Sequence, residues 1–152
     1  MIDFALTADA VAPQLLGCTL THAGVSIRLT EVEAYLGAED SAAHTFKGKT
    51  PRNAAMFGPP GRFYVYISYG IHRNVNIVCA PDGTGQGCLL RGGEIIEGAD
   101  IAFARRGTTD FHNLARGPGN LGKALGFTLE DNHQPIQIVE RTSEPEWVRG
   151  PR

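Results

Sequence analysis

Apolar and polar side chains alternate along the middle of the chain, and this period of two residues is typical of β-strands. The clearest case is the segment 63–79, where strand-forming residues flank the dipeptide Tyr69-Gly70 and alternate with tyrosines and asparagines. We expect a β-hairpin with one face in the core and the other face polar. Tyr69 would then lie at the turn of this hairpin.

Shorter patterns predict the remaining elements. Strands are expected at 18–22, 25–35, 88–96 and 136–140, and helices at 9–16, 51–57, 97–106 and 120–125. Pro13 fits the first of these helices only near its first turn, because proline lacks the N–H group that an interior position donates. Strands in the middle and helices at the periphery predict a compact α+β domain.

Composition adds few constraints. The chain has 152 residues, of which 42% are hydrophobic and 20% charged, as expected for one globular domain. No apolar stretch approaches the roughly 18–20 residues of a membrane helix, and the start of the chain does not resemble a secretory signal, so we expect a soluble, cytoplasmic protein. Cys18, Cys79 and Cys88 lie in apolar segments and are expected as buried thiols without a disulfide.

Charge is distributed unevenly along the chain. The formal net charge is -2, yet residues 41–125 contain ten basic and five acidic residues, which makes that segment +5. A basic surface is typical of proteins that bind nucleic acids. On charge alone, chance clustering on a solvated surface remains the favoured interpretation.

Glu33 and Tyr35 are the first candidates for chemistry. They are two residues apart in the expected strand 25–35, so both side chains should lie on one face. A carboxylate beside an aromatic ring, with His44 and the hairpin tyrosines downstream, suggests a pocket for a flat polar ring. Glu33 could activate a water molecule if an arginine were near, but a structural Glu33 in a salt bridge is equally consistent, and Glu31 on the same face is an alternative.

Other types of site have little support. The five histidines are scattered without the spacing of a zinc motif, so neither a metal nor another cofactor is expected. There is no Gly-x-Ser-x-Gly elbow and no P-loop. Gly117-Pro118-Gly119 precedes an expected helix and could hold one backbone phosphate through its amides, although a simple turn is the commoner interpretation.

Several blocks of sequence, in the same order, resemble the alkyladenine (3-methyladenine) DNA glycosylase family. The blocks are EVEAYLG (31–37), DSAAH (40–44), TPRN (50–53), MF (56–57), YVYISYG (64–70) and LLR (89–91). The resemblance runs from about residue 15 to residue 127. It implies a single α+β domain over residues 1–152 with a mainly antiparallel curved sheet, peripheral helices and a protruding β-hairpin.

The resemblance implies a base-excision-repair enzyme. Glu33 would deprotonate a water that attacks the anomeric carbon of a damaged purine nucleotide, and Arg91 matches the family arginine that helps to hold this water. Because no catalytic lysine is matched, we expect a monofunctional N-glycosylase without lyase activity. The expected substrates are alkylated or deaminated purines of the 3-methyladenine, hypoxanthine and ethenoadenine class, and the expected partner is double-stranded DNA bound by a monomer.

The same resemblance assigns a pocket for a base that has been flipped out of the duplex. Tyr35 matches one stacking plate, and His44 and Tyr66 match the opposite wall. Asn76 matches the residue that disfavours guanine by crowding its exocyclic amine, although a cross-strand hydrogen bond would also explain an asparagine there.

Residues that would contact the DNA come from the hairpin and its surroundings. Tyr69 matches the residue that inserts into the gap left by the flipped base, and Ile71 and His72 are expected to line the minor groove. Arg52 and Lys123 are further expected DNA contacts.

Two departures from the family pattern affect these expectations. Asn120 follows Gly117-Pro118-Gly119 where the family commonly has a lysine, and Lys123 comes one helical turn later. The chain also stops at Arg152, where relatives continue through another strand, so the domain looks short at its C-terminus. The short C-terminus leaves open a damaged-DNA-binding protein that has lost turnover. A hydrolase of free nucleosides is a second alternative, although such an enzyme would not need a basic surface with a residue that inserts into DNA.

Overall fold

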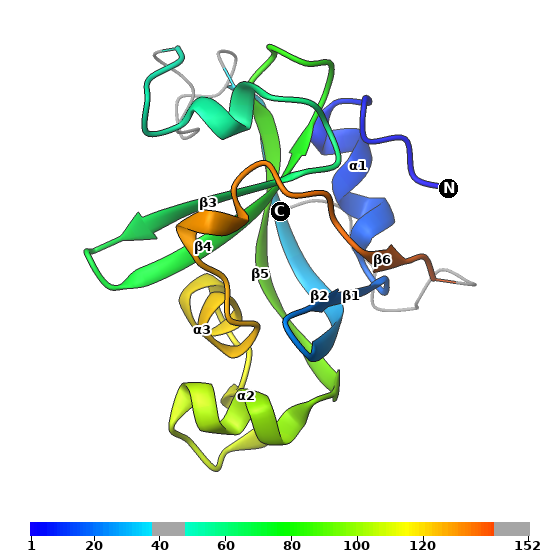
Figure 1. The fold of residues 1–152 in the computed structure, drawn as a ribbon. Helices are drawn as coiled ribbons and strands as arrows, with labels where there is room; N and C mark the ends of the chain where they lie inside the picture. The colour runs from blue at the N-terminus through cyan, green and yellow to red at the C-terminus, as the bar shows by residue number, and fades with distance from the viewer. Residues whose placement is uncertain (38–47, 142–152) are drawn as a thin grey trace.

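An antiparallel sheet organises the chain. The computed structural model describes residues 1–37 and 48–141, and within them six strands pair in the order β3-β4-β5-β2-β1-β6 (Figure 1). The strands are β1 Thr19–His22, β2 Val25–Tyr35, β3 Phe63–Ser68, β4 His72–Cys79, β5 Gln86–Glu97 and β6 Ile138–Val139. This arrangement confirms the predicted single α+β domain with a mainly antiparallel sheet.

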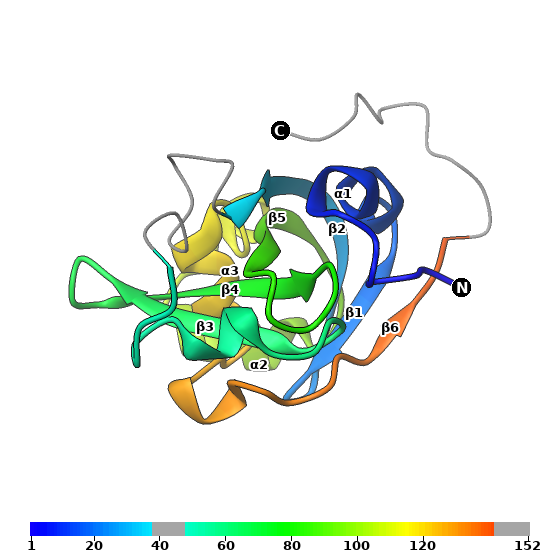
Figure 2. The ribbon, with the colours of Figure 1, turned by 90° about the horizontal axis from the view of Figure 1, so that it is seen from above.

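Helices surround the sheet. The α-helices are α1 Ala8–Leu15, α2 Ala99–Arg106 and α3 Pro118–Ala124, and the short 3₁₀ segments are η2 Ala54–Phe57, η3 Phe111–Asn113 and η4 Leu129–Asp131. In Figures 1 and 2, α1 lies near β2. In Figure 1, α3 lies next to the β3–β4 hairpin, and α2 lies below α3, farther from the hairpin. Among the residues described, none of these helices is long and apolar enough to cross a bilayer.

Two predictions about helices are wrong in detail. The segment 51–57 forms only the 3₁₀ turn η2, because the side chain of Asn53 accepts from the amide of Thr50 at 2.7 Å and donates to the carbonyl of Gly48 at 3.2 Å, which fixes a turn. Pro13 lies in the second half of α1 and not in its first turn. This short helix tolerates the missing hydrogen bond because its inner face is buried in the main core.

Other boundaries shift by a few residues. The α2 helix begins at Ala99 because Glu97 still belongs to β5 and Gly98 adopts a left-handed conformation (φ 76°). The late strand β6 keeps only two of the five residues expected. Both hairpins are confirmed, since β1 pairs with β2 and β3 pairs with β4 in continuous antiparallel register.

The hydrophobic core has two parts. The main cluster joins the sheet to the α-helices and includes the fully buried Leu15, Ile27 and Leu121. A smaller cluster consists of Ala55, Met56, Tyr64 and Val78, and it lies on the other face of the β3–β4 hairpin. The face that we expected to be polar is therefore largely buried where it covers this second cluster.

The β3–β4 hairpin extends beyond the body of the domain (Figures 1 and 2). Its turn is made by Tyr69 and Gly70, both with positive φ (53° and 73°). A tyrosine in this conformation is uncommon. Its side chain is 94% exposed, so the ring projects into solvent at the end of the hairpin.

Candidate functional site

Glu33 and Tyr35 lie on the same face of β2, as predicted, and are in direct contact. The Tyr35 hydroxyl donates a short hydrogen bond to Oε1 of Glu33. Opposite these residues, β5 places Leu89 beside Glu33 and Gly87 beside Tyr35. The Glu33 side chain is 28% exposed and so remains accessible to water.

Arg91 reaches this carboxylate from β5. Its Nη1 lies 3.1 Å from Oε2 of Glu33, and its Nε lies 3.9 Å from Oε2 of Glu31. The strand register changes at this point, because Glu31 pairs with Gly92 while Val32 pairs with Leu90, which leaves Arg91 as an extra residue in β5. Such a bulge redirects a side chain, and here it sends the guanidinium towards both glutamates.

The environment of Tyr35 keeps its hydroxyl protonated. Burial, the hydrogen bond to Glu33 and the negative charge of Glu33 all raise the pKa of Tyr35 well above its usual value. The phenol is therefore a lasting donor to Oε1, while Arg91 donates to Oε2. A carboxylate offers about four lone-pair positions, so one water molecule can still bind to Glu33 beside these two donors.

Aromatic and amide side chains of the hairpin lie next to this group. The rings of Tyr64 and Tyr66 are stacked with centroids 5.6 Å apart, and both Tyr66 and Tyr35 pack against the second hydrophobic cluster. Asn76 is 2% exposed and donates to the carbonyl oxygen of Tyr64 at 3.4 Å. The cross-strand hydrogen bond considered for Asn76 is thus present. His44, the other expected wall of the pocket, lies outside the described residues.

Sequence reasoning missed the contribution of Asn74. Its Nδ2 donates to the Tyr66 hydroxyl at 3.2 Å, which orients that ring, while its buried Oδ1 has no hydrogen-bond partner in the part of the chain that the structure describes. The alternation of asparagines with apolar residues was visible in the sequence, but only the folded hairpin brings Asn74 to Tyr66. Buried unpaired acceptors are uncommon in folded proteins, and a catalytic role is one of the explanations for them.

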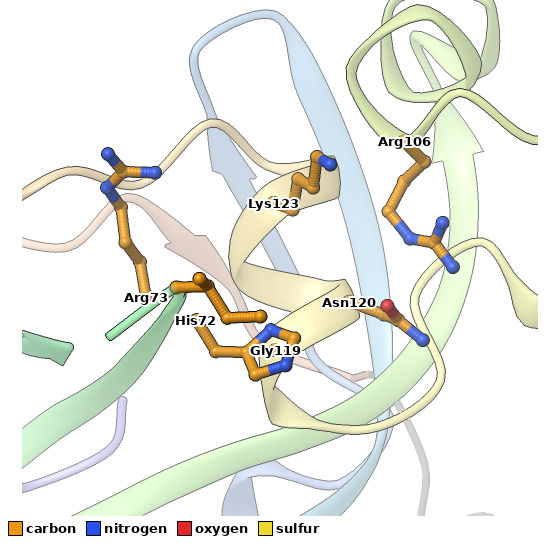
Figure 3. Close-up of a pocket in the computed structure, with 7 residues that line it drawn as sticks. His72, Arg73, Arg106, Gly119, Asn120 and Lys123 are labelled. Carbon is orange, nitrogen blue, oxygen red and sulfur yellow. The ribbon is translucent and has the colours of Figure 1, made fainter. Parts of the chain in front are cut away.

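The residues expected to contact DNA gather around the hairpin. Tyr69 and Ile71 are 94% and 72% exposed. Arg52 donates from Nη2 to the carbonyl oxygen of Ile67 at 3.0 Å, which anchors it beside β3. His72 and Lys123 line a pocket between the hairpin and α3 (Figure 3).

The described part of the chain contains no group of three or more histidine, cysteine or acidic residues arranged to hold a metal ion. Cys18, Cys79 and Cys88 are buried and free, as predicted. His22 has a structural position, since it stacks on Phe127 and its ring nitrogens contact the carbonyl of Leu125 and the carboxylate of Asp131.

Comparison with known proteins places these features in context. The family model described as "Methylpurine-DNA glycosylase (MPG)" matches residues 2–152. A protein of Corynebacterium efficiens named "Putative 3-methyladenine DNA glycosylase" is 67% identical over 156 residues, covering 99% of this chain and 82% of the relative. Relatives with the same name occur in Corynebacterium glutamicum strain ATCC 13032, at 64% identity (99% and 83% covered), and in Rhodopseudomonas palustris, at 47% identity (98% and 74% covered).

Proposed function

The chain belongs to the methylpurine-DNA glycosylase family, and from this premise we propose that it excises alkylated and deaminated purines from duplex DNA by hydrolysing the N-glycosidic bond. The observation that carries the proposal is the position of Glu33, a water-accessible carboxylate held by Arg91 and Tyr35. This group lies beside the stacked tyrosines of the hairpin.

In the proposed reaction, Glu33 accepts a proton from a bound water as the water oxygen attacks the anomeric carbon. The bond between that carbon and the purine nitrogen breaks, and its electron pair leaves with the base. An alkylated purine such as 3-methyladenine carries a positive charge in DNA, so it departs as a neutral molecule. The sugar becomes cationic in the transition state, and the negative charge of Glu33 stabilises it.

Arg91 orients both the carboxylate and the water. Its contact with Oε2 of Glu33 at 3.1 Å supports this role, because a guanidinium has five donors in a fixed plane. The bulge in β5 fixes the direction from which the guanidinium approaches. Glu31 is a second carboxylate near the same guanidinium, with its Oε2 3.9 Å from Nε of Arg91. It is not the proposed base.

A base flipped out of the duplex would be held between aromatic rings. Tyr35 provides one plate, and Tyr66 with His44 the other, so that a cationic purine gains from both faces. Asn74 holds Tyr66 through its hydroxyl, which supports the position of this wall. Asn76, buried beside Tyr64, would crowd the exocyclic amine of guanine and so disfavour normal guanine.

The exposed hairpin would replace the flipped base in the stack. Tyr69 is fixed by the turn and exposed, which suits insertion between base pairs, and Ile71 would follow it into the minor groove. We further propose that the enzyme is monofunctional. Glu33 activates water and not an amine, so the products are a free base and an intact strand with an abasic site.

A panel of duplexes tests this function. Each duplex contains one hypoxanthine, ethenoadenine or 3-methyladenine, and base release is measured with the full chain. We expect release of at least one of these bases, with strand scission only after alkali treatment. Binding of the duplexes without any release would instead support a damaged-DNA-binding protein, and activity confined to free nucleosides would support a nucleoside hydrolase.

A further inference from the structure

A basic pocket lies beside the turn end of the β3–β4 hairpin, and Glu33 is not among the residues that line it. It has a volume of about 240 Å³ and lies between the start of β4, α3 and the end of α2. Ligand pockets for drug-sized molecules are usually about 300–1,000 Å³, so this space suits a smaller group. In Figure 3 the side chains of His72, Asn120 and Lys123 extend towards the side on which Arg106 lies.

The charge of the pocket is of one sign. Of the residues that the structure describes, Arg73, Arg106 and Lys123 line it and no acidic residue does. Within the part of the chain that the structure describes, the ion pairs use other basic groups, and none involves these three side chains. The like charges of Arg106 and Lys123 repel each other, and an anion bound between these two side chains would offset that repulsion.

Arg106 has unused donors at this place. Its Nη2 donates to the carbonyl oxygen of Asn113 at 3.2 Å, and its buried Nε has no hydrogen-bond partner among the described residues. The neighbouring Arg105 differs, because its guanidinium donates to the carbonyl oxygens of Ala124 and Ala23 and so ties α2 to the domain. Of these two arginines, Arg106 is therefore the one with a donor available to a ligand in the pocket.

Two glycines of α3 bring the helix against the hairpin. A Cβ atom at Gly119 would lie 2.7 Å from Nδ1 of His72, and one at Gly122 would collide with the carbonyl oxygen of Arg73. Close packing of α3 on the start of β4 therefore depends on these glycines. It places Lys123 of α3 at the same opening as His72 of β4.

We propose that this pocket binds a phosphodiester group of the DNA backbone, with Arg106 and Lys123 as its principal cations. The identification of the bound polymer as DNA rests on the proposed function. Ile71 lines the pocket and is two residues from Tyr69, so a duplex engaged by the tip of the hairpin would pass over the opening. Arg73 lies at the rim, with its guanidinium directed away from Arg106 (Figure 3).

The salt dependence of DNA binding tests the proposal without a measurement of catalysis. The logarithm of affinity for a duplex with a stable abasic analogue is measured against the logarithm of salt concentration. Each phosphate contact contributes about 0.9 to the slope, so Lys123→Gln and Arg106→Gln should each reduce the slope by about 1. Arg106→Lys keeps the charge and should keep the slope.

Arg28→Gln is the matched control, because Arg28 lies outside the pocket and contacts Glu94 at 3.7 Å. This control should bind with the slope of the original protein. Unchanged slopes in both Lys123→Gln and Arg106→Gln would overturn the proposal. A reduced slope in Arg106→Lys as large as that in Arg106→Gln would also overturn it, because the loss would then reflect altered folding and not lost charge.

A neutral methylphosphonate placed at successive positions of the duplex locates the phosphate. At one position it should weaken binding by the original protein and have no further effect on Lys123→Gln, since the pair is already lost. Additive effects at every position would contradict the pocket. Binding with this pattern but without base release would contradict only the proposed glycosylase function, whereas base release with unchanged slopes would contradict only the phosphate site.

Discussion

Nη1 of Arg91 lies 3.1 Å from Oε2 of Glu33, and this contact joins β5 to β2, two strands that are far apart along the chain. The bulge that makes Arg91 an extra residue in β5 directs it there. The contact leaves Glu33 partly exposed, so the carboxylate is oriented without being sealed from water. The proposed chemistry depends on this combination of orientation and access.

Replacement of Arg91 tests its role as a positioning donor. A hydrogen bond to a charged group contributes about 1.5–3 kcal/mol, so Arg91→Met should slow base release by roughly 10- to 100-fold at saturating enzyme. Arg91→Lys should recover part of the rate, because it restores a cation but not the planar donors. The measurement is the single-turnover rate of base release. Equal rates for the two variants would show that the charge of Arg91 plays no part.

Tyr35 has two proposed roles that two substitutions separate. Tyr35→Phe keeps the ring for stacking and removes the hydroxyl that donates to Glu33. We expect a slower chemical step with nearly unchanged affinity for a lesion duplex. Tyr35→Ala removes both and should also weaken lesion binding by about 1–3 kcal/mol, the range for base–aromatic stacking. Titration of binding beside single-turnover kinetics distinguishes these effects, and equal affinity losses in both variants would contradict stacking.

Tyr64 should make the domain sensitive to alkali. Burial, and next the proximity of Tyr66, raise the pKa of Tyr64 to about 12, above its value of about 10 in an unfolded chain. Since the folded state holds this proton more tightly, the stabilisation is complete below pH 10 and is lost as the pH rises through about 12. The loss should be on the order of 2 kcal/mol.

Chemical denaturation at neutral and alkaline pH measures this effect. The free energy of unfolding should fall less steeply above pH 10 in Tyr64→Phe than in the original protein, because phenylalanine cannot ionise. Parallel pH profiles for the two proteins would show that Tyr64 ionises equally in both states.

Local patterns in the sequence were sufficient to predict the main strands and to place Glu33 and Tyr35 on one face of their strand. Alternation predicted β2, β3 and β4, and the period of two put Glu33 and Tyr35 on one face. Patterns of this kind are local, and strand geometry alone determines them. The family resemblance, carried by several blocks in order, supplied the expected substrate and is consistent with the match over residues 2–152.

Features that depend on distant contacts were not predictable. The bulge at Arg91 arises from pairing between β2 and β5, and no local signal in either strand marks it. The hydrogen bond from Asn74 to Tyr66 and the contribution of Arg106 to the basic pocket likewise require the folded arrangement of hairpin and helices. The prediction that Pro13 lies near the first turn of its helix was wrong for the same reason, since burial of α1 outweighs local helix preference.

The most direct test of the central claim compares Glu33→Gln with Glu31→Gln in single-turnover base release from a hypoxanthine duplex. Both substitutions remove one negative charge beside Arg91, but only the first removes the proposed base. Glu33→Gln should lower the rate by about 10²–10⁴-fold or more while lesion binding persists, and Glu31→Gln should have a much smaller effect. Undiminished release by Glu33→Gln, or an equal loss in Glu31→Gln, would contradict the account.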